Sequence, residues 1–175
     1  MDSIILFGTR DCHKVRFYMD ALQGRGLAFR LAEVDRDAEA ARHLTELTGN
    51  ADRFPTLLIA GRKLRNPSLI DLDKALARAG LHDPGLVHDE KGQRLVRWMA
   101  PRDAFVSYRW QGERMILTHA EVAPELQGQG FGTRLATDAF DMLAPRSHDI
   151  RLACPFLIRV ARTRPEWRAR FGLEA

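Results

Sequence analysis

A glycine-rich segment in the second half of the chain has the composition of an anion-binding loop. It reads Gln127-Gly128-Gln129-Gly130-Phe131-Gly132-Thr133 and lies between an apolar segment and an amphipathic one. Glycines let a backbone approach a ligand closely with its N–H groups turned outward, and a helix N-terminus adds partial positive charge. The segment therefore predicts a cradle for a pyrophosphate group.

Two well-known nucleotide-binding motifs do not match this segment. The dinucleotide fingerprint needs G-x-G-x-x-G after the first strand of a parallel βαβ unit. Here Gly128, Gly130 and Gly132 are spaced G-x-G-x-G and follow three segments typical of antiparallel strands. The Gly-Lys-Ser/Thr sequence of a P-loop is also absent. The alternative to an anion-binding loop is a plain turn with no ligand.

Three further side chains are candidates for acid–base or nucleophilic chemistry. Cys12 stands between a predicted strand and a predicted helix, and a helix N-terminus stabilises a thiolate. Cys154 could protonate a leaving group or accept an acyl group, and His119 could act as a base. The alternatives are a small buried core residue for Cys154 and a structural histidine for His119. Histidines and cysteines show no metal-ligand spacing, and two distant cysteines do not predict a disulfide.

Hydrophobic periodicity and turn residues divide the chain into two parts. In the first part we expect the order β-α-β-α-β-β-α, and in the second β-β-β-α-β-α. Residues 80–85 are typical of a linker, which predicts domains at 1–82 and 86–175. The expected strands are 4–8, 28–34, 54–60, 63–64, 92–99, 104–110, 115–122 and 150–156, and the expected helices are 12–23, 37–48, 69–79, 133–143, 157–162 and one from Pro165.

The second part resembles the small, single-domain branch of the GCN5-related N-acetyltransferases (GNAT). Gln127, Gly130 and Gly132 fill the Gln/Arg-x-x-Gly-x-Gly/Ala signature of that superfamily. Residues 117–126, 153–156 and 164–167 resemble three other segments of the branch, in the same order. The likeness spans residues 92–173 and implies a mixed sheet in which strands 115–122 and 150–156 splay apart.

This resemblance implies binding of acetyl-coenzyme A. Backbone groups near Val122 would bind the pantetheine arm, and residues 127–133 would hold the pyrophosphate. Many members use a tyrosine to protonate the departing thiolate, but Tyr108 is the only tyrosine of this part. Cys154 and His119 are therefore the candidate catalytic side chains for acetyl transfer to a small-molecule or protein amine.

The first part resembles glutaredoxins over residues 3–80. Residues 5–12 are similar to their first strand and active-site approach, and Phe54-Pro55-Thr56 stands where they carry a cis-proline. The resemblance implies a thioredoxin-like fold with Cys12 as a redox thiol, and makes Arg10, Phe54 and Pro55 candidate contacts for glutathione. Val15 replaces the second cysteine, so only monothiol chemistry is open. The Gly-Gly-x-Asp segment that holds glutathione in the family is missing.

The sequence therefore predicts an α/β (α+β) chain in which a thioredoxin-like domain precedes an acetyl-CoA-dependent N-acetyltransferase. The alternatives are a glutathione-linked oxidoreductase using Cys12, and a non-enzymatic adaptor that binds coenzyme A or senses redox state. The chain has 175 residues and a net charge of +4. No basic run is interleaved with aromatics, so nucleic acid is not favoured. No apolar window is long enough for a membrane span, and residues 4–7 are too short for a signal-peptide core, so we expect a cytoplasmic protein.

Overall fold

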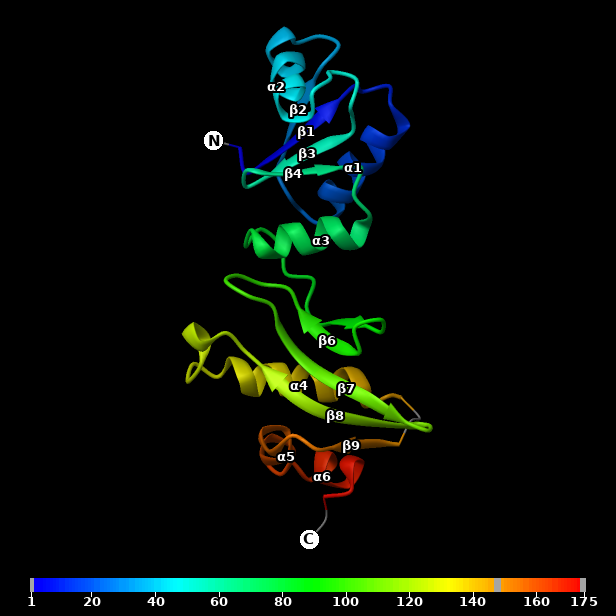
Figure 1. Cartoon of the computed structure of the whole chain (residues 1–175), viewed down its shortest axis with the longest axis vertical. Coiled ribbons are helices and arrows are strands. Elements are labelled where there is room, and N and C mark those ends of the chain that lie inside the picture. Colours follow the sequence, from blue (N-terminus) through cyan, green and yellow to red (C-terminus); the bar gives the residue numbers. More distant parts are fainter. Residues whose placement is uncertain (1, 147–148, 174–175) are drawn as a thin grey trace. The chain divides into compact units, whose positions relative to one another are not determined.

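The computed structural model describes residues 2–146 and 149–173 and divides the chain into two compact units. The first unit is Met1–Asp83 and the second is Pro84–Ala175. Each unit has its own sheet (Figure 1).

The first unit is a four-stranded mixed sheet in the order β2-β1-β3-β4. β1 pairs parallel with β2 and antiparallel with β3, and β3 pairs antiparallel with β4. Its elements are β1 (Ile4–Gly8), α1 (His13–Gly24), β2 (Arg30–Glu33), α2 (Ala38–Thr48), β3 (Thr56–Ile59), β4 (Arg62–Arg65) and α3 (Leu69–Arg78).

Both faces of this sheet are covered, which explains why all five residues of β1 are buried. On one face Leu6 packs with Val15 and Leu22 of α1 and with Leu76 of α3. On the other face Phe7 joins a cluster that includes Ala40 and Leu44 of α2. The element order and strand directions are those of the predicted thioredoxin-like fold.

Element ends in the first unit follow local chemistry. The Asp37 carboxylate accepts from the N–H groups of Glu39 and Ala40 and so begins α2. β3 begins at Thr56 rather than at the predicted Phe54, because Pro55 has no N–H to donate to a sheet. The Phe54–Pro55 peptide bond is cis, as the resemblance to glutaredoxins implies.

The second unit is a five-stranded mixed sheet in the order β5-β6-β7-β8-β9. The pairs are antiparallel except for the parallel pair of β8 and β9. One core cluster unites the inner side chains of the sheet with α4, α5 and α6. The elements are β5 (Val87–Asp89), β6 (Arg94–Arg97), β7 (Ala104–Gln111), β8 (Arg114–Glu121), the 3₁₀ helix η1 (Pro124–Leu126), α4 (Phe131–Leu143), β9 (Ile150–Leu152), α5 (Pro155–Ala161) and α6 (Pro165–Phe171).

Three details of the second unit differ from the sequence prediction. β5 was not predicted, because three residues are too few for a period-two pattern. The strand predicted to end at Phe156 ends at Leu152, since Pro155 is pre-organised for the first turn of α5. α4 begins at Phe131 rather than Thr133, so part of the predicted loop is helix. The fold class as predicted, with two mixed sheets, is nevertheless confirmed.

β8 and β9 separate halfway along β8. They pair from Met115 to Leu117, and the Leu117 carbonyl then accepts from the N–H groups of both Ala153 and Cys154, at 2.9 and 3.3 Å. A register shift in the pairing with β7 makes Thr118 an extra residue at this point. Such a bulge bends and twists a strand. The second half of β8 therefore runs on to Glu121 with β7 as its neighbour and, among the described strands, no partner on the β9 side.

Candidate functional site

A cavity of about 560 Å³ lies between the glycine-rich loop and the unpartnered half of β8. It combines the peptide groups of a loop with apolar side chains from β8 and α5. The lining residues are Ala120, Val122, Gln127, Gly128, Gly130, Gly132, Thr133 and Phe156. The tertiary structure thus brings six of the eight residues predicted to bind a coenzyme around one space.

The loop ends at an open helix N-terminus. Gly128 and Gly130 have φ values of 74° and 81°, in the left-handed region that favours glycine. Gly130 is the N-cap of the 13-residue helix α4, and no side chain caps that end. The N–H groups of the first turn therefore lack intrahelical acceptors. This geometry suits an anionic group.

Gly132 is required for a different reason. A Cβ atom on this residue would lie 3.1 Å from Cζ of Phe156, a separation that real Cβ atoms rarely show. Glycine therefore lets the first turn of α4 approach the Phe156 ring of α5. Both residues line the cavity.

The second half of β8 offers peptide groups to the cavity. The peptide groups of Met115 and Leu117 point toward β9, as their bonds to Asp149 and Ala153 show. One extra residue at Thr118 shifts this alternation, so the peptide groups of Ala120 and Val122 face the edge that β9 has left. An extended, amide-containing ligand could pair with that edge as a strand would.

Four predicted site residues lie outside the cavity lining. The Gln129 amide donates to the carbonyl of Glu125 at 2.9 Å, and the Phe131 side chain is largely exposed. Cys154 is the N-cap of α5, and its side chain is 7% exposed within the core cluster. His119 points to the opposite face of β8 from Ala120, where it lies 3.5 Å from the Glu121 carboxylate.

Two lining residues were missed in the sequence-based prediction. Ala120 lies on β8 two residues before the predicted Val122, and strand alternation from Val122 was the signal that could have found it. Phe156 was assigned to a strand, whereas the structure places it in the first turn of α5. The helix-start preference of Pro155 was the available signal.

Tyr108 is a core residue of the second unit. Its side chain is 4% exposed, and its hydroxyl lies 2.8 Å from Nε2 of His88. Nδ1 of His88 lies 3.3 Å from Nη2 of Arg146. A guanidinium only donates, so Nδ1 accepts and Nε2–H donates to Tyr108. Burial and the Arg146 charge lower the pKa of His88, and burial raises the pKa of Tyr108. Neither ring lines the cavity.

The first unit presents Cys12 at the start of a helix. Cys12 is the N-cap of α1 and is partly exposed. The Arg10 guanidinium forms an ion pair of 3.0 Å with Glu33. Cys12 and Phe54 pack against the same core cluster, and Pro55 is buried. Four predicted residues thus lie on the segments that flank α1 and β3.

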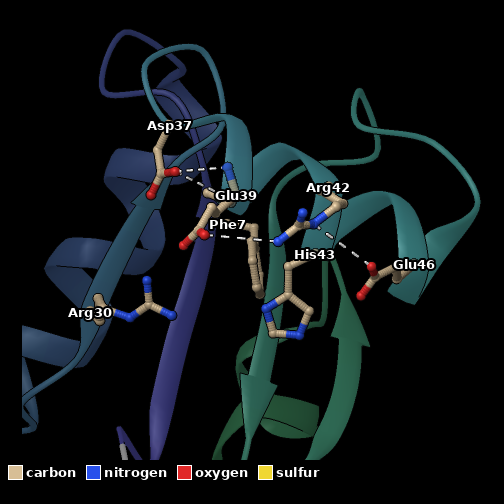
Figure 2. Close-up of a pocket in the computed structure, with 8 residues that line it drawn as sticks. Phe7, Arg30, Asp37, Glu39, Arg42, His43 and Glu46 are labelled. Carbon is tan, nitrogen blue, oxygen red and sulfur yellow. Dashed lines mark hydrogen bonds and ion pairs between the residues drawn. The ribbon is translucent and has the colours of Figure 1, made fainter.

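A second cavity, of about 430 Å³, lies between α2 and the sheet of the first unit (Figure 2). Phe7 lies at its base, with its ring edge-on to His43 at a centroid distance of 5.1 Å. Arg42 lies 3.9 Å from Glu39 and 4.0 Å from Glu46, and Arg30 forms an ion pair of 2.9 Å with Asp2, which lies outside the lining. This cavity includes none of the predicted glutathione contacts.

Two further properties of the described residues bear on function. Within 2–146 and 149–173, no group of three or more His, Cys, Asp or Glu side chains could hold a metal ion. Over the same residues, no helix combines the length and apolar character needed to cross a membrane.

Solved structures similar to part of this chain cover its first half. The thioredoxin-like protein BC3987, in a mutant form, is 22% identical, covers 43% of this chain and 96% of its own, and has a TM-score of 0.40. The glutaredoxin (grx-1) from Archaeoglobus fulgidus is 14% identical, covers 43% and 87%, and has a TM-score of 0.39. No curated protein matches the chain.

A family model matches the second half. The matched residues are 97–170, and the family is described as GCN5-related N-acetyl-transferase. The match includes β7, β8, the loop and α4, and therefore the whole lining of the 560 Å³ cavity. Residues 97–170 of the second unit are thus similar to an acetyltransferase-type domain of the GCN5-related family.

Proposed function

We propose that the second unit is an acetyl-CoA-dependent N-acetyltransferase and that its 560 Å³ cavity holds the coenzyme. The observation that carries the proposal is the joining of two features in one cavity: an uncapped helix N-terminus behind left-handed glycines, and an unpartnered strand edge. Coenzyme A has matching parts, a pyrophosphate and an amide-containing pantetheine arm. Both features lie within the segment that matches the family.

Each part of the coenzyme has a named counterpart. The N–H groups at Gly130, Gly132 and Thr133 would bind the pyrophosphate. The peptide groups of Ala120 and Val122 would pair with the pantetheine amides, and Phe156 would pack against its apolar segments. The thioester would then lie where β8 and β9 separate. The acceptor is a small-molecule or protein amine, whose nitrogen attacks the thioester carbonyl and loses a proton. The C–S bond then breaks, and coenzyme A leaves as a thiolate that takes up a proton.

Two side chains are proposed to assist the acetyl transfer. His119 lies on the face of β8 opposite the cavity, so it could act only on an acceptor that approaches from that face. Cys154 lies at the end of the β8–β9 pairing, and its thiol is buried. We propose His119 as the base and Cys154 as the group nearest the coenzyme sulfur.

Calorimetric titration of coenzyme A and acetyl-CoA into the full chain tests the coenzyme site. We expect binding that weakens roughly 10-fold in a Gly128→Ala/Gly130→Ala variant, because a left-handed non-glycine residue costs about 1–2 kcal/mol. The added Cβ atoms meet nothing within 4 Å, so only the backbone geometry is perturbed.

The matched control is Gly85→Ala/Gly112→Ala. These glycines also have positive φ and open space, at 77° and 59°, and lie elsewhere in the second unit. We expect the control to bind like the unaltered protein. Equal weakening by both variants, or no binding by the unaltered protein, would contradict the coenzyme site. Binding without acetylation of any amine in a screen would favour a non-enzymatic, coenzyme-binding adaptor.

We also propose monothiol chemistry at Cys12 in the first unit. The observation behind it is a partly exposed sulfur at the N-terminus of a 12-residue helix, where a thiolate is stabilised. The reaction is thiol–disulfide exchange with glutathione disulfide: the Cys12 thiolate attacks one sulfur, a mixed disulfide forms and glutathione thiolate leaves.

Mass spectrometry after incubation with glutathione disulfide tests this chemistry. We expect one glutathione adduct on Cys12, none on the buried Cys154 and none in a Cys12→Ser variant. The matched Cys154→Ser variant should still form the adduct. A protein that stays unmodified at Cys12 would contradict the proposal and leave the first unit without thiol chemistry.

A further inference from the structure

The helices α5 and α6 concentrate the positive charge of the chain. Residues 155–171 hold five arginines and a single carboxylate, that of Glu166. Their net charge is therefore +4, equal to the formal net charge of the whole protein. The arginines are Arg159, Arg162, Arg164, Arg168 and Arg170.

Four of these arginines are exposed and have no carboxylate partner in the described part of the chain. Arg159 and Arg162 lie three residues apart at the end of α5, and Arg164 and Arg168 lie four apart on α6, so the members of each pair share a side. The Arg159 guanidinium lies over the Phe156 ring at 5.7 Å, and that of Arg164 lies over Trp167 at 4.4 Å. These two guanidinium groups therefore stack on aromatic rings and keep their positive charge.

The same surface lacks an apolar anchor. None of the exposed large hydrophobic side chains of the described residues belongs to α5 or α6, and Trp167 and Phe171 of α6 are buried. Protein interfaces depend on buried aromatic and aliphatic anchors, and single-stranded nucleic acid stacks its bases on exposed aromatics. The backbone of a nucleic-acid duplex can be bound without apolar anchors and without exposed aromatic rings, because cationic side chains bind its phosphates directly.

We propose that the exposed arginine face of α5 and α6 binds the phosphate backbone of double-stranded nucleic acid without sequence preference. Guanidinium groups suit this role because they bind phosphate oxygens in a bidentate manner. The inference goes beyond acetyl transfer and does not depend on it. The linear sequence did not favour nucleic acid, since the arginines form no continuous run. Helix geometry brings four of them together as two pairs.

Fluorescence anisotropy with a labelled DNA duplex of about 20 base pairs tests the inference on the full chain. With about four phosphate contacts, affinity should fall roughly 100-fold between about 50 and 200 mM salt. An Arg162→Ala/Arg168→Ala variant should lower the slope of log affinity against log salt by about two. Its fold is checked by circular dichroism and thermal unfolding.

The matched control is Arg102→Ala/Arg109→Ala, which removes the same charge from exposed positions elsewhere in the second unit. We expect this control to lower the slope by less than half as much as the first variant does. An equal loss in both variants would show general attraction to a basic protein and would overturn the proposal.

Three other outcomes would also overturn it. The unaltered protein could fail to bind the duplex. Poly-glutamate or single-stranded DNA could bind more tightly than the duplex and lose affinity in the same variant, which would identify a different partner. Finally, the Arg162→Ala/Arg168→Ala variant could lose affinity for coenzyme A and not for DNA, which would assign these arginines to the coenzyme.

Discussion

A Gly132→Val variant is expected to lose most of its affinity for coenzyme A while keeping its fold. The new Cβ would already lie 3.1 Å from Cζ of Phe156, and the two methyl groups of valine would extend into the cavity. Overfilling a packed site costs about 1–3 kcal/mol, so we expect affinity to fall by roughly 10- to 100-fold. Calorimetric titration of coenzyme A measures the loss.

The helix itself should tolerate this change. Gly132 does not have a positive φ, and valine is a better helix former than glycine. The control is Ala144→Val, which introduces the same side chain at the exposed C-terminal end of α4. We expect the control to bind normally.

A second substitution tests the steric cause. Phe156→Ala removes the ring that the new side chain would meet, but it also removes a proposed coenzyme contact, so the comparison needs a double-mutant cycle. We expect Gly132→Val to weaken binding less in the Phe156→Ala background than in the unaltered protein. If Gly132→Val costs the same affinity in both backgrounds, the contact with Phe156 is not the reason for the loss. If Gly132→Val binds as tightly as the unaltered protein, the cavity is not the coenzyme site.

Phe140→Ala is expected to destabilise the second unit by about 3–5 kcal/mol. The Phe140 side chain is fully buried on α4, and its ring lies 5.1 Å from that of Trp167 and 4.8 Å from that of Phe171. Removing it leaves a void between α4 and α6 that a packed core cannot fill. Since domains are only marginally stable, such a loss removes a large share of the folding free energy.

Urea unfolding followed by tryptophan fluorescence measures this effect selectively. The three tryptophans of the chain, Trp98, Trp110 and Trp167, all lie in the second unit. The control is Phe131→Ala, the same change on the same helix at a side chain that is 38% exposed. It should lower the free energy of unfolding by less than about 1 kcal/mol. Equal losses in both variants would contradict the core position of Phe140.

Several features of this protein follow from short stretches of sequence. The glycines of the loop, the Asp37 cap and the prolines at helix starts act through their own backbone or their immediate neighbours. Periodicity placed the helices for the same reason, because an amphipathic helix carries its pattern within a few turns. The order of elements other than β5 and η1, the mixed sheet of the second unit and the position of the loop before α4 were therefore predictable.

The shape of the candidate site depended on tertiary contacts. β9 stops at Leu152 because the Leu117 carbonyl takes both following N–H groups and Pro155 begins α5. The bulge at Thr118 turns His119 away from the cavity, and no local pattern in β8 marks that extra residue.

Tertiary contacts also determine which residues Tyr108 and Phe156 touch. Tyr108 is buried against His88 of β5, a strand too short to recognise in the sequence. Phe156 lines the cavity because α5 meets α4 at Gly132, a residue more than twenty positions earlier in the chain. Local sequence therefore determined the backbone of the loop, whereas pairing between distant segments determined which side chains surround it, because those contacts form only when the sheet and helices pack together.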